Sequence, residues 1–224
     1  FTNTKGSLHI STFSAAMTEY LVSQGMNIIA PNVRGSVGYG KTYTHLDDVE
    51  KRLDSVHDID ALVKHLVETG IADKDRIAVM GGSYGGFMTL SCVARYPELW
   101  AAGVDVVGMT NLVTFLENTS EYRRAHRESE YGTLAHDRET LYNVSPIAKV
   151  GDIKAPLMVI HGANDPRVPV TEADMIVENV KSRGIEVSYL RYEDEGHGLA
   201  KRKNQLDCYP QVVAILKKHL RMED

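Results

Sequence analysis

Apolar stretches alternate with amphipathic stretches along most of the chain. Strand-like runs of apolar or alternating residues occupy residues 26–31, 76–80, 101–107, 157–160 and 186–192. Apolar residues recur at helical spacing in residues 56–68, 88–95, 172–181 and 210–220. Because helical stretches separate the strands, the pattern predicts an α/β fold with a mostly parallel sheet and helices on both faces. No repeat or low-complexity linker interrupts the pattern, and we expect residues 1–224 to form one domain.

The composition narrows the classes of function. The chain is 43% hydrophobic and 25% charged, which is typical of a soluble globular protein. Its net charge of −5 and its lack of a long basic run argue against nucleic acid or a membrane as the main partner. Residues 1–20 lack a signal-peptide pattern and two cysteines cannot form a disulfide framework, so we expect a cytoplasmic protein. No His and carboxylate spacing is typical of a zinc site, and we expect no metal or other cofactor.

A Gly-x-Ser-x-Gly segment centred on Ser83 joins the strand pattern of residues 76–80 to the next helical pattern. A serine on a sharp strand-to-helix turn has strained backbone angles and an exposed hydroxyl, and it needs small neighbours. Gly81 and Gly85 provide these small neighbours. The same turn directs the backbone N–H of Tyr84 towards the group that the serine attacks. We therefore predict Ser83 as a nucleophile and Tyr84 N–H as an oxyanion donor.

A serine nucleophile needs a base within hydrogen-bond reach, and the base needs an acid that orients it. In an open parallel sheet these partners are expected just beyond the carboxyl ends of later strands. Asp165 follows the strand pattern of residues 157–160, and His197 follows that of residues 186–192. The chain order Ser83, Asp165, His197 is the order of nucleophile, acid and base in α/β-hydrolases.

Other interpretations of these residues remain open at this point. An aspartate before a proline is commonly a turn former, so spacing alone does not decide between a turn and a catalytic role for Asp165. Asp105 and Asp194 are rival acids, although Asp105 lies inside an apolar run and Asp194 is close in sequence to the base. His161 ends its strand and is expected to be a structural group that lines the turn.

Several motifs, in the same order, resemble the catalytic domain of the prolyl oligopeptidase family, especially its acylaminoacyl-peptidase-like and dipeptidyl-peptidase-like branch. They occupy residues 32–40, 81–86, 145–147, 161–169 and 194–198, and the resemblance runs from about Phe13 to near the end of the chain. It implies an α/β-hydrolase fold with Ser83 as nucleophile, Asp165 as orienting acid and His197 as general base. It also implies cleavage of short peptides or acyl-peptides at an N-terminal end, with a β-propeller gating access. A carboxylesterase on the same triad is the alternative, and a non-catalytic hydrolase-like module is a third hypothesis.

Part of the family pattern is absent from this sequence. There is no propeller, and the His-Gly-Gly-Pro-type segment expected a little before Phe13 does not occur in residues 1–12. In hydrolases of this fold that segment follows a central strand and helps to build the oxyanion hole. We therefore expect the sequence to be truncated at its N-terminus, with the upstream segment or propeller on a missing part of the chain or on another chain. A second copy of the same chain, in a homo-oligomer, is a further candidate partner.

The sequence says less about specificity. The stretch from 110 to 143 is polar with scattered aromatic residues, and it is the natural place for a pocket wall. Phe115 and Tyr122 could equally pack this insertion onto the domain. An arginine in a strand-end loop, such as Arg34 or Arg167, could bind a substrate carboxylate or brace the loop, and bracing is favoured. The candidate substrate-binding residues are Phe115, Tyr122, Arg167 and Val168.

Overall fold

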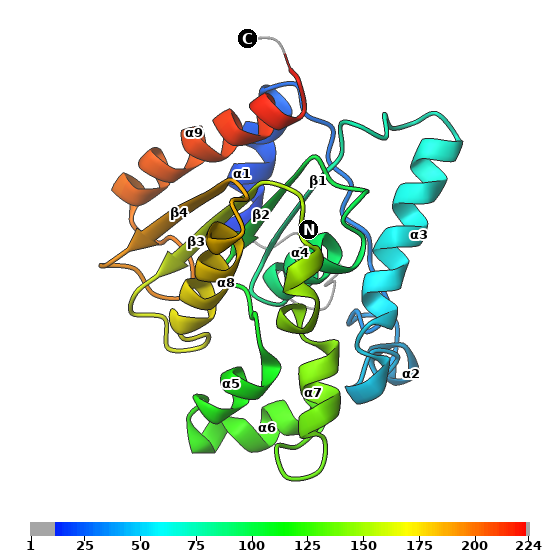
Figure 1. Cartoon of the computed structure of the whole chain (residues 1–224), viewed down its shortest axis with the longest axis vertical. Coiled ribbons are helices and arrows are strands. Elements are labelled where there is room, and N and C mark those ends of the chain that lie inside the picture. Colours follow the sequence, from blue (N-terminus) through cyan, green and yellow to red (C-terminus); the bar gives the residue numbers. More distant parts are fainter. Residues whose placement is uncertain (1–11, 223–224) are drawn as a thin grey trace.

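The structure is a computed structural model that describes residues 12–222 (Figure 1). A four-stranded parallel sheet lies at the centre of these residues, and its strands follow one another in space in the order in which they occur in the chain. Gly82 pairs with Val106, and Val106 pairs with Ile160, so the carboxyl ends of the strands meet at one edge. The strands are β1 (Ala78–Gly82), β2 (Ala102–Val106), β3 (Leu157–Gly162) and β4 (Val187–Tyr192).

Helices cover both faces of the sheet, as the sequence pattern predicts (Figure 1). Successive residues of β3 point to opposite faces, so Val159 enters one apolar core and Ile160 the other. The core around Val159 is completed by helices α3 (Asp54–Glu68), α4 (Tyr84–Arg95) and α8 (Thr171–Ser182). The core around Ile160 is completed by α1 (Thr12–Ser23) and α9 (Arg202–His219).

Between β2 and β3 the chain leaves the sheet and forms a helical insertion that lies below it in Figure 1. The insertion consists of α5 (Leu112–Glu117), α6 (Glu121–Tyr131), α7 (Arg138–Val144) and the 3₁₀ helix η2 (Pro146–Asp152). The buried carboxylate of Glu172, in α8, accepts hydrogen bonds from the backbone N–H groups of Thr110 and Asn111. This carboxylate fixes the start of α5 against the sheet domain.

The predicted strand over residues 26–31 is wrong. Residues 26–33 have no regular secondary structure, and within the described chain β1 has a hydrogen-bonded neighbour only in β2. A cavity of about 470 Å³ separates this segment from β1, with Met26 and Ile28 on one side and Met80 on the other. The segment has the apolar side chains of a strand but no strand close enough to pair with, and backbone pairing is what defines a strand.

Helix boundaries also differ from the sequence pattern. The last helix begins at Arg202 rather than at Pro210, and this proline lies inside it. The pattern also did not predict α1, nor the short helices α2 (Lys41–Thr44) and η1 (Val49–Lys51) that precede α3. Within residues 12–222, no helix combines the length and the apolarity needed to cross a bilayer.

Candidate active site

Ser83 occupies the sharp turn between β1 and α4 that the sequence predicts. Its backbone has φ 57° and ψ −115°, in a region that costs a non-glycine residue about 1–3 kcal/mol. The Ser83 N–H donates to the carbonyl of Val106 at 2.8 Å, which fixes the turn against β2. A Cβ on Gly81 would lie 2.2 Å from the carbonyl oxygen of Gly85, so the turn has no room for a side chain there.

The structure brings Ser83, His197 and Asp165 together in one continuous hydrogen-bonded chain. His197 Nε2 lies 2.9 Å from Ser83 Oγ, and His197 Nδ1 lies 2.7 Å from Asp165 Oδ2. The three residues come from the loops that follow β1, β3 and β4, which end at the same edge of the sheet. This is the arrangement of a nucleophile, a base and an orienting acid.

Asp165 has the surroundings of a permanently ionised carboxylate. Its Oδ1 accepts hydrogen bonds from the backbone N–H groups of Arg167 at 2.7 Å and Val168 at 3.0 Å. Burial alone would raise the pKa of Asp165, but these bonds and the one from His197 outweigh burial and hold the pKa below its usual range. The carboxylate therefore stays charged at neutral pH and holds the imidazole in place.

His161 and the two rival acids lie in other surroundings. His161 is fully buried, its Nε2 lies 3.0 Å from the carbonyl of Val168, and burial lowers its pKa. Asp194 forms ion pairs with Lys201 at 2.9 Å and Lys203 at 2.8 Å. Asp105 is fully buried in β2. The structure thus places Asp165, and not either rival, against His197.

Tyr84 is the first residue of α4, so its backbone N–H lies at a helix N-terminus, where such groups have no acceptor within the helix. This position suits an oxyanion donor. Residues 1–12, which lack the His-Gly-Gly-Pro-type segment of a second oxyanion donor, lie almost entirely outside the described residues.

The candidate substrate-binding residues do not form one surface. Phe115 is 1% exposed and its ring contacts Tyr131 at a centroid distance of 6.0 Å, which favours the packing interpretation. Val168 is also buried, and its carbonyl lies against His161. Tyr122 is 83% exposed on α6, and Arg167 is exposed beside Asp165.

Arg34 braces its loop. Its Nε donates to Asp58 Oδ1 at 2.9 Å, and its guanidinium also pairs with Asp54 at 3.2 Å.

No group of three or more metal-ligating side chains occurs among residues 12–222.

Comparison with known proteins identifies the family. The model of the prolyl oligopeptidase family matches residues 11–223. The chain is 35% identical over 210 residues to dipeptidyl peptidase family member 6 of Caenorhabditis elegans, a match that covers 91% of this chain and 28% of the relative. It is 36% identical over 191 residues to dipeptidyl aminopeptidase BIII of Pseudoxanthomonas mexicana, covering 83% of this chain and 28% of the relative.

A solved structure is also similar over nearly the whole chain. The puromycin-hydrolyzing peptidase of Mycobacterium tuberculosis superposes with a TM-score of 0.87 at 27% identity, covering 93% of this chain and 32% of that one. The chain spans 28% of the length of the two curated relatives. Sequence, fold and the hydrogen-bonded serine, histidine and aspartate agree, and the chain belongs to the prolyl oligopeptidase family.

Proposed function

We propose that residues 1–224 are the catalytic domain of a serine peptidase that cleaves short peptides near an N-terminal end through an acyl-enzyme. The observation that carries this proposal is the continuous hydrogen-bonded chain from Ser83 Oγ through His197 to Asp165. It supplies a base at the nucleophile and a charge behind the base, which is what a serine hydroxyl needs to react at neutral pH.

The proposed reaction is acyl transfer in two halves. His197 Nε2 takes the proton of Ser83 as Oγ attacks the scissile carbonyl carbon, and the backbone N–H of Tyr84 donates to the oxyanion. The imidazolium, stabilised by Asp165, then gives its proton to the leaving amine as the C–N bond breaks. Water, deprotonated by His197, attacks the acyl-enzyme and releases Ser83.

The substrate class follows from the family branch. Both curated relatives named above are called dipeptidyl peptidases, which favours a short peptide with a free N-terminus as substrate. An acylated N-terminal residue is the other substrate in the branch that the motifs resemble. Arg167 and Tyr122 are exposed and remain candidates for contact with the substrate. Two buried free cysteines, Cys92 and Cys208, fit a reducing cytoplasmic setting.

A further strand beside β1 is part of the proposal. The cavity between residues 26–29 and β1 has apolar walls, and the strand edge facing it has no partner among residues 12–222. An unpaired edge in the middle of a domain is costly, because its backbone N–H and C=O groups need partners. We expect an upstream segment of the natural protein to fill this cavity. An intact-mass measurement matching 224 residues, on natural protein that is folded and active alone, would refute this expectation.

Labelling with a fluorophosphonate probe tests the proposed nucleophile. The protein should be labelled, and Ser83→Ala should lose both the labelling and the turnover while keeping its fold. Turnover of a dipeptidyl-p-nitroanilide, an acyl-peptide and a p-nitrophenyl ester then separates the substrate classes. Cleavage of the ester alone would favour a carboxylesterase, and a folded protein inert towards all of them would refute catalysis.

A further inference from the structure

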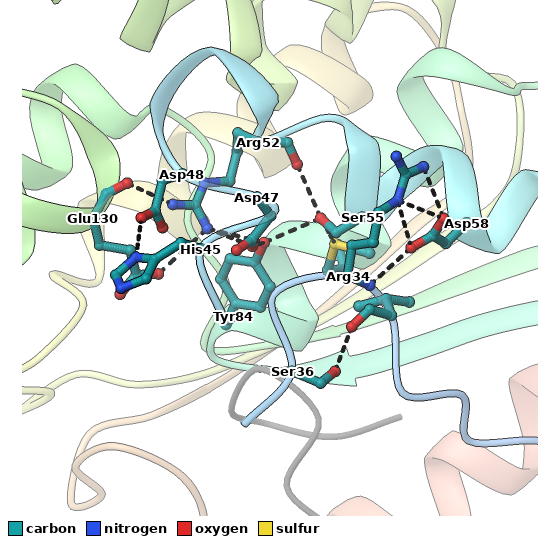
Figure 2. A network of polar contacts seen from close by, with 12 residues as sticks. Arg34, Ser36, His45, Asp47, Asp48, Arg52, Ser55, Asp58, Tyr84 and Glu130 are labelled. Atoms are coloured by element: carbon teal, nitrogen blue, oxygen red, sulfur yellow. Dashed lines mark hydrogen bonds and ion pairs between the residues drawn. The ribbon is translucent and has the colours of Figure 1, made fainter. Parts of the chain in front are cut away.

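Arg52 is a fully buried cation close to the proposed nucleophile. It lies between η1 and α3, and its Nη1 donates to Asp47 Oδ2 at 2.8 Å and to the phenol oxygen of Tyr84 at 3.1 Å. Its Nη2 donates to the backbone carbonyl of Glu130, in α6, at 2.8 Å. Figure 2 shows this guanidinium between the loop that carries Asp47, the first turn of α4 and the helical insertion.

The phenol of Tyr84 is bound from several sides. It donates to Asp47 Oδ2 at 2.7 Å, and Ser55 Oγ lies 3.1 Å from its oxygen (Figure 2). Its ring packs against Phe87, one helical turn later, at a centroid distance of 5.5 Å. Burial raises the pKa of this phenol, so it remains a neutral hydrogen-bond donor at neutral pH. The side chain of the residue after Ser83 is therefore held at its far end as well as at its backbone.

The glycine-rich loop at residues 34–40 is built around the same carboxylate. A Cβ on Gly35 would lie 2.0 Å from Asp47 Oδ1, and the φ of Gly35 is +89°. Only glycine leaves room for Asp47 to reach Arg52 and Tyr84. This close contact explains the glycine at position 35. The proposed roles of Ser83, His197 and Asp165 do not explain it.

A buried ion pair often contributes little net free energy to the stability of a fold. Arg52 and Asp47 are both 0% exposed, and removing two charges from water often costs more than their attraction returns. The cluster lies beside the turn at which Ser83 has strained backbone angles. Such strain persists only where the surroundings over-determine it, and a cluster that anchors the neighbouring tyrosine contributes to this.

We propose that Arg52 is a positioning residue, which acts through Asp47 and the phenol of Tyr84 to hold the backbone N–H of Tyr84 where the oxyanion forms. The contact with Glu130 extends this support to α6, so that docking of the insertion and alignment of the oxyanion donor depend on each other. This inference rests on the proposed peptidase function and names a residue that acts in it without touching the substrate.

The test compares Tyr84→Phe and Arg52→Lys with the unchanged protein. Tyr84→Phe removes one hydroxyl and keeps the ring, while a lysine has a single nitrogen in place of the two, Nη1 and Nη2, that bind Asp47 and the Glu130 carbonyl. Complete loss of an oxyanion donor costs about 100- to 1000-fold in kcat, so misalignment is expected to cost about 10-fold or more in kcat with little change in KM. Binding of a peptide aldehyde, which forms a tetrahedral adduct, should weaken by the factor by which kcat/KM falls.

Matched controls separate positioning from stability. Tyr189→Phe also removes a tyrosine–aspartate hydrogen bond, of 2.8 Å to Asp174, but in β4. Arg95→Lys changes an arginine that binds backbone carbonyls at the far end of α4. Both controls should keep kcat and aldehyde affinity even where thermal unfolding shifts as in the test variants. If Arg52→Lys does not fold, Tyr84→Phe carries the test alone.

The outcomes distinguish this inference from the function on which it rests. A protein that turns over substrate, with Tyr84→Phe and Arg52→Lys folded and equal to it in kcat, overturns the positioning role alone. So does a loss confined to KM, or one without weaker aldehyde binding. An unchanged protein that neither reacts with the fluorophosphonate nor turns over any substrate overturns the proposed function and this inference together.

Discussion

Replacing Asp165 with asparagine tests the proposed acid through the tautomer of His197. Asp165 Oδ1 accepts hydrogen bonds from the N–H groups of Arg167 and Val168, at 2.7 and 3.0 Å. In the variant only the amide oxygen can accept these bonds, because an NH₂ group has no acceptor capacity. The amide NH₂ must then face His197 Nδ1, which lies 2.7 Å from Oδ2 in the unchanged protein.

This geometry makes His197 the wrong tautomer. With Nδ1 accepting from the amide, the single proton of the neutral imidazole lies on Nε2 and points at Ser83 Oγ, 2.9 Å away. The imidazole can then no longer take the serine proton. In serine peptidases the same exchange lowers kcat about 10⁴-fold, which corresponds to about 5 kcal/mol in the activation barrier.

The assay is steady-state hydrolysis of the best substrate, with the rate of fluorophosphonate labelling measured in parallel. Asp194→Asn is the matched control, because Asp194 is the rival acid and instead forms ion pairs with lysines. It should keep kcat within a few-fold. Circular dichroism and thermal unfolding check that Asp165→Asn remains folded. An Asp165→Asn protein that keeps more than a tenth of kcat would refute the assignment. An Asp194→Asn protein whose kcat falls as far as that of Asp165→Asn would refute it too.

Further predictions concern stability and the turn. Burial raises the pKa of Asp105 to about 7, so stability should fall as pH rises from the usual carboxyl range through about 7, because the unfolded chain releases this proton first. Asp105→Asn should flatten the difference in Tm between pH 5 and pH 8, and an unchanged difference would contradict this. Glu172→Met keeps the length of the side chain but leaves the backbone N–H groups of Thr110 and Asn111 without an acceptor at the start of α5, and it should cost about 1–3 kcal/mol in a denaturant titration. Gly81→Ala should abolish fluorophosphonate labelling because its Cβ would meet the carbonyl oxygen of Gly85, whereas Gly151→Ala, with no atom within 4 Å of its Cβ, should label normally.

The site follows from the sequence more completely than the sheet does. Ser83, Asp165 and His197 each lie in the turn or loop that follows a strand, and the topology of a parallel sheet brings such positions to one edge whatever the details of packing. Residues 26–31 show the opposite case. Their apolar pattern is that of a strand, but a strand also requires a neighbour at hydrogen-bonding distance, and no neighbour for it occurs in the described chain.

The sequence pattern does not predict hydrogen-bond networks between side chains that are far apart in the chain. Arg52 lies in a stretch of charged residues and gives no sign of being buried, yet it is 0% exposed. Its environment is made by Asp47, Tyr84 and Glu130, which meet only once β1, α4 and the insertion have docked. A buried arginine amid polar sequence is an outcome of tertiary packing, which local periodicity does not encode.

The strands lie in space in the order in which they occur in the chain, and this order affects how the site is assembled during synthesis. As a chain emerges from the ribosome, β1 and its serine turn are made first, and each later strand can add to the edge left by the one before. Asp165 follows the third strand and His197 the fourth, so the proposed base is the last part of the proposed triad to be synthesised. A nascent or prematurely ended chain can therefore form the serine turn without holding a reactive serine. The proposed peptide cleavage therefore has to wait until synthesis has passed the last strand.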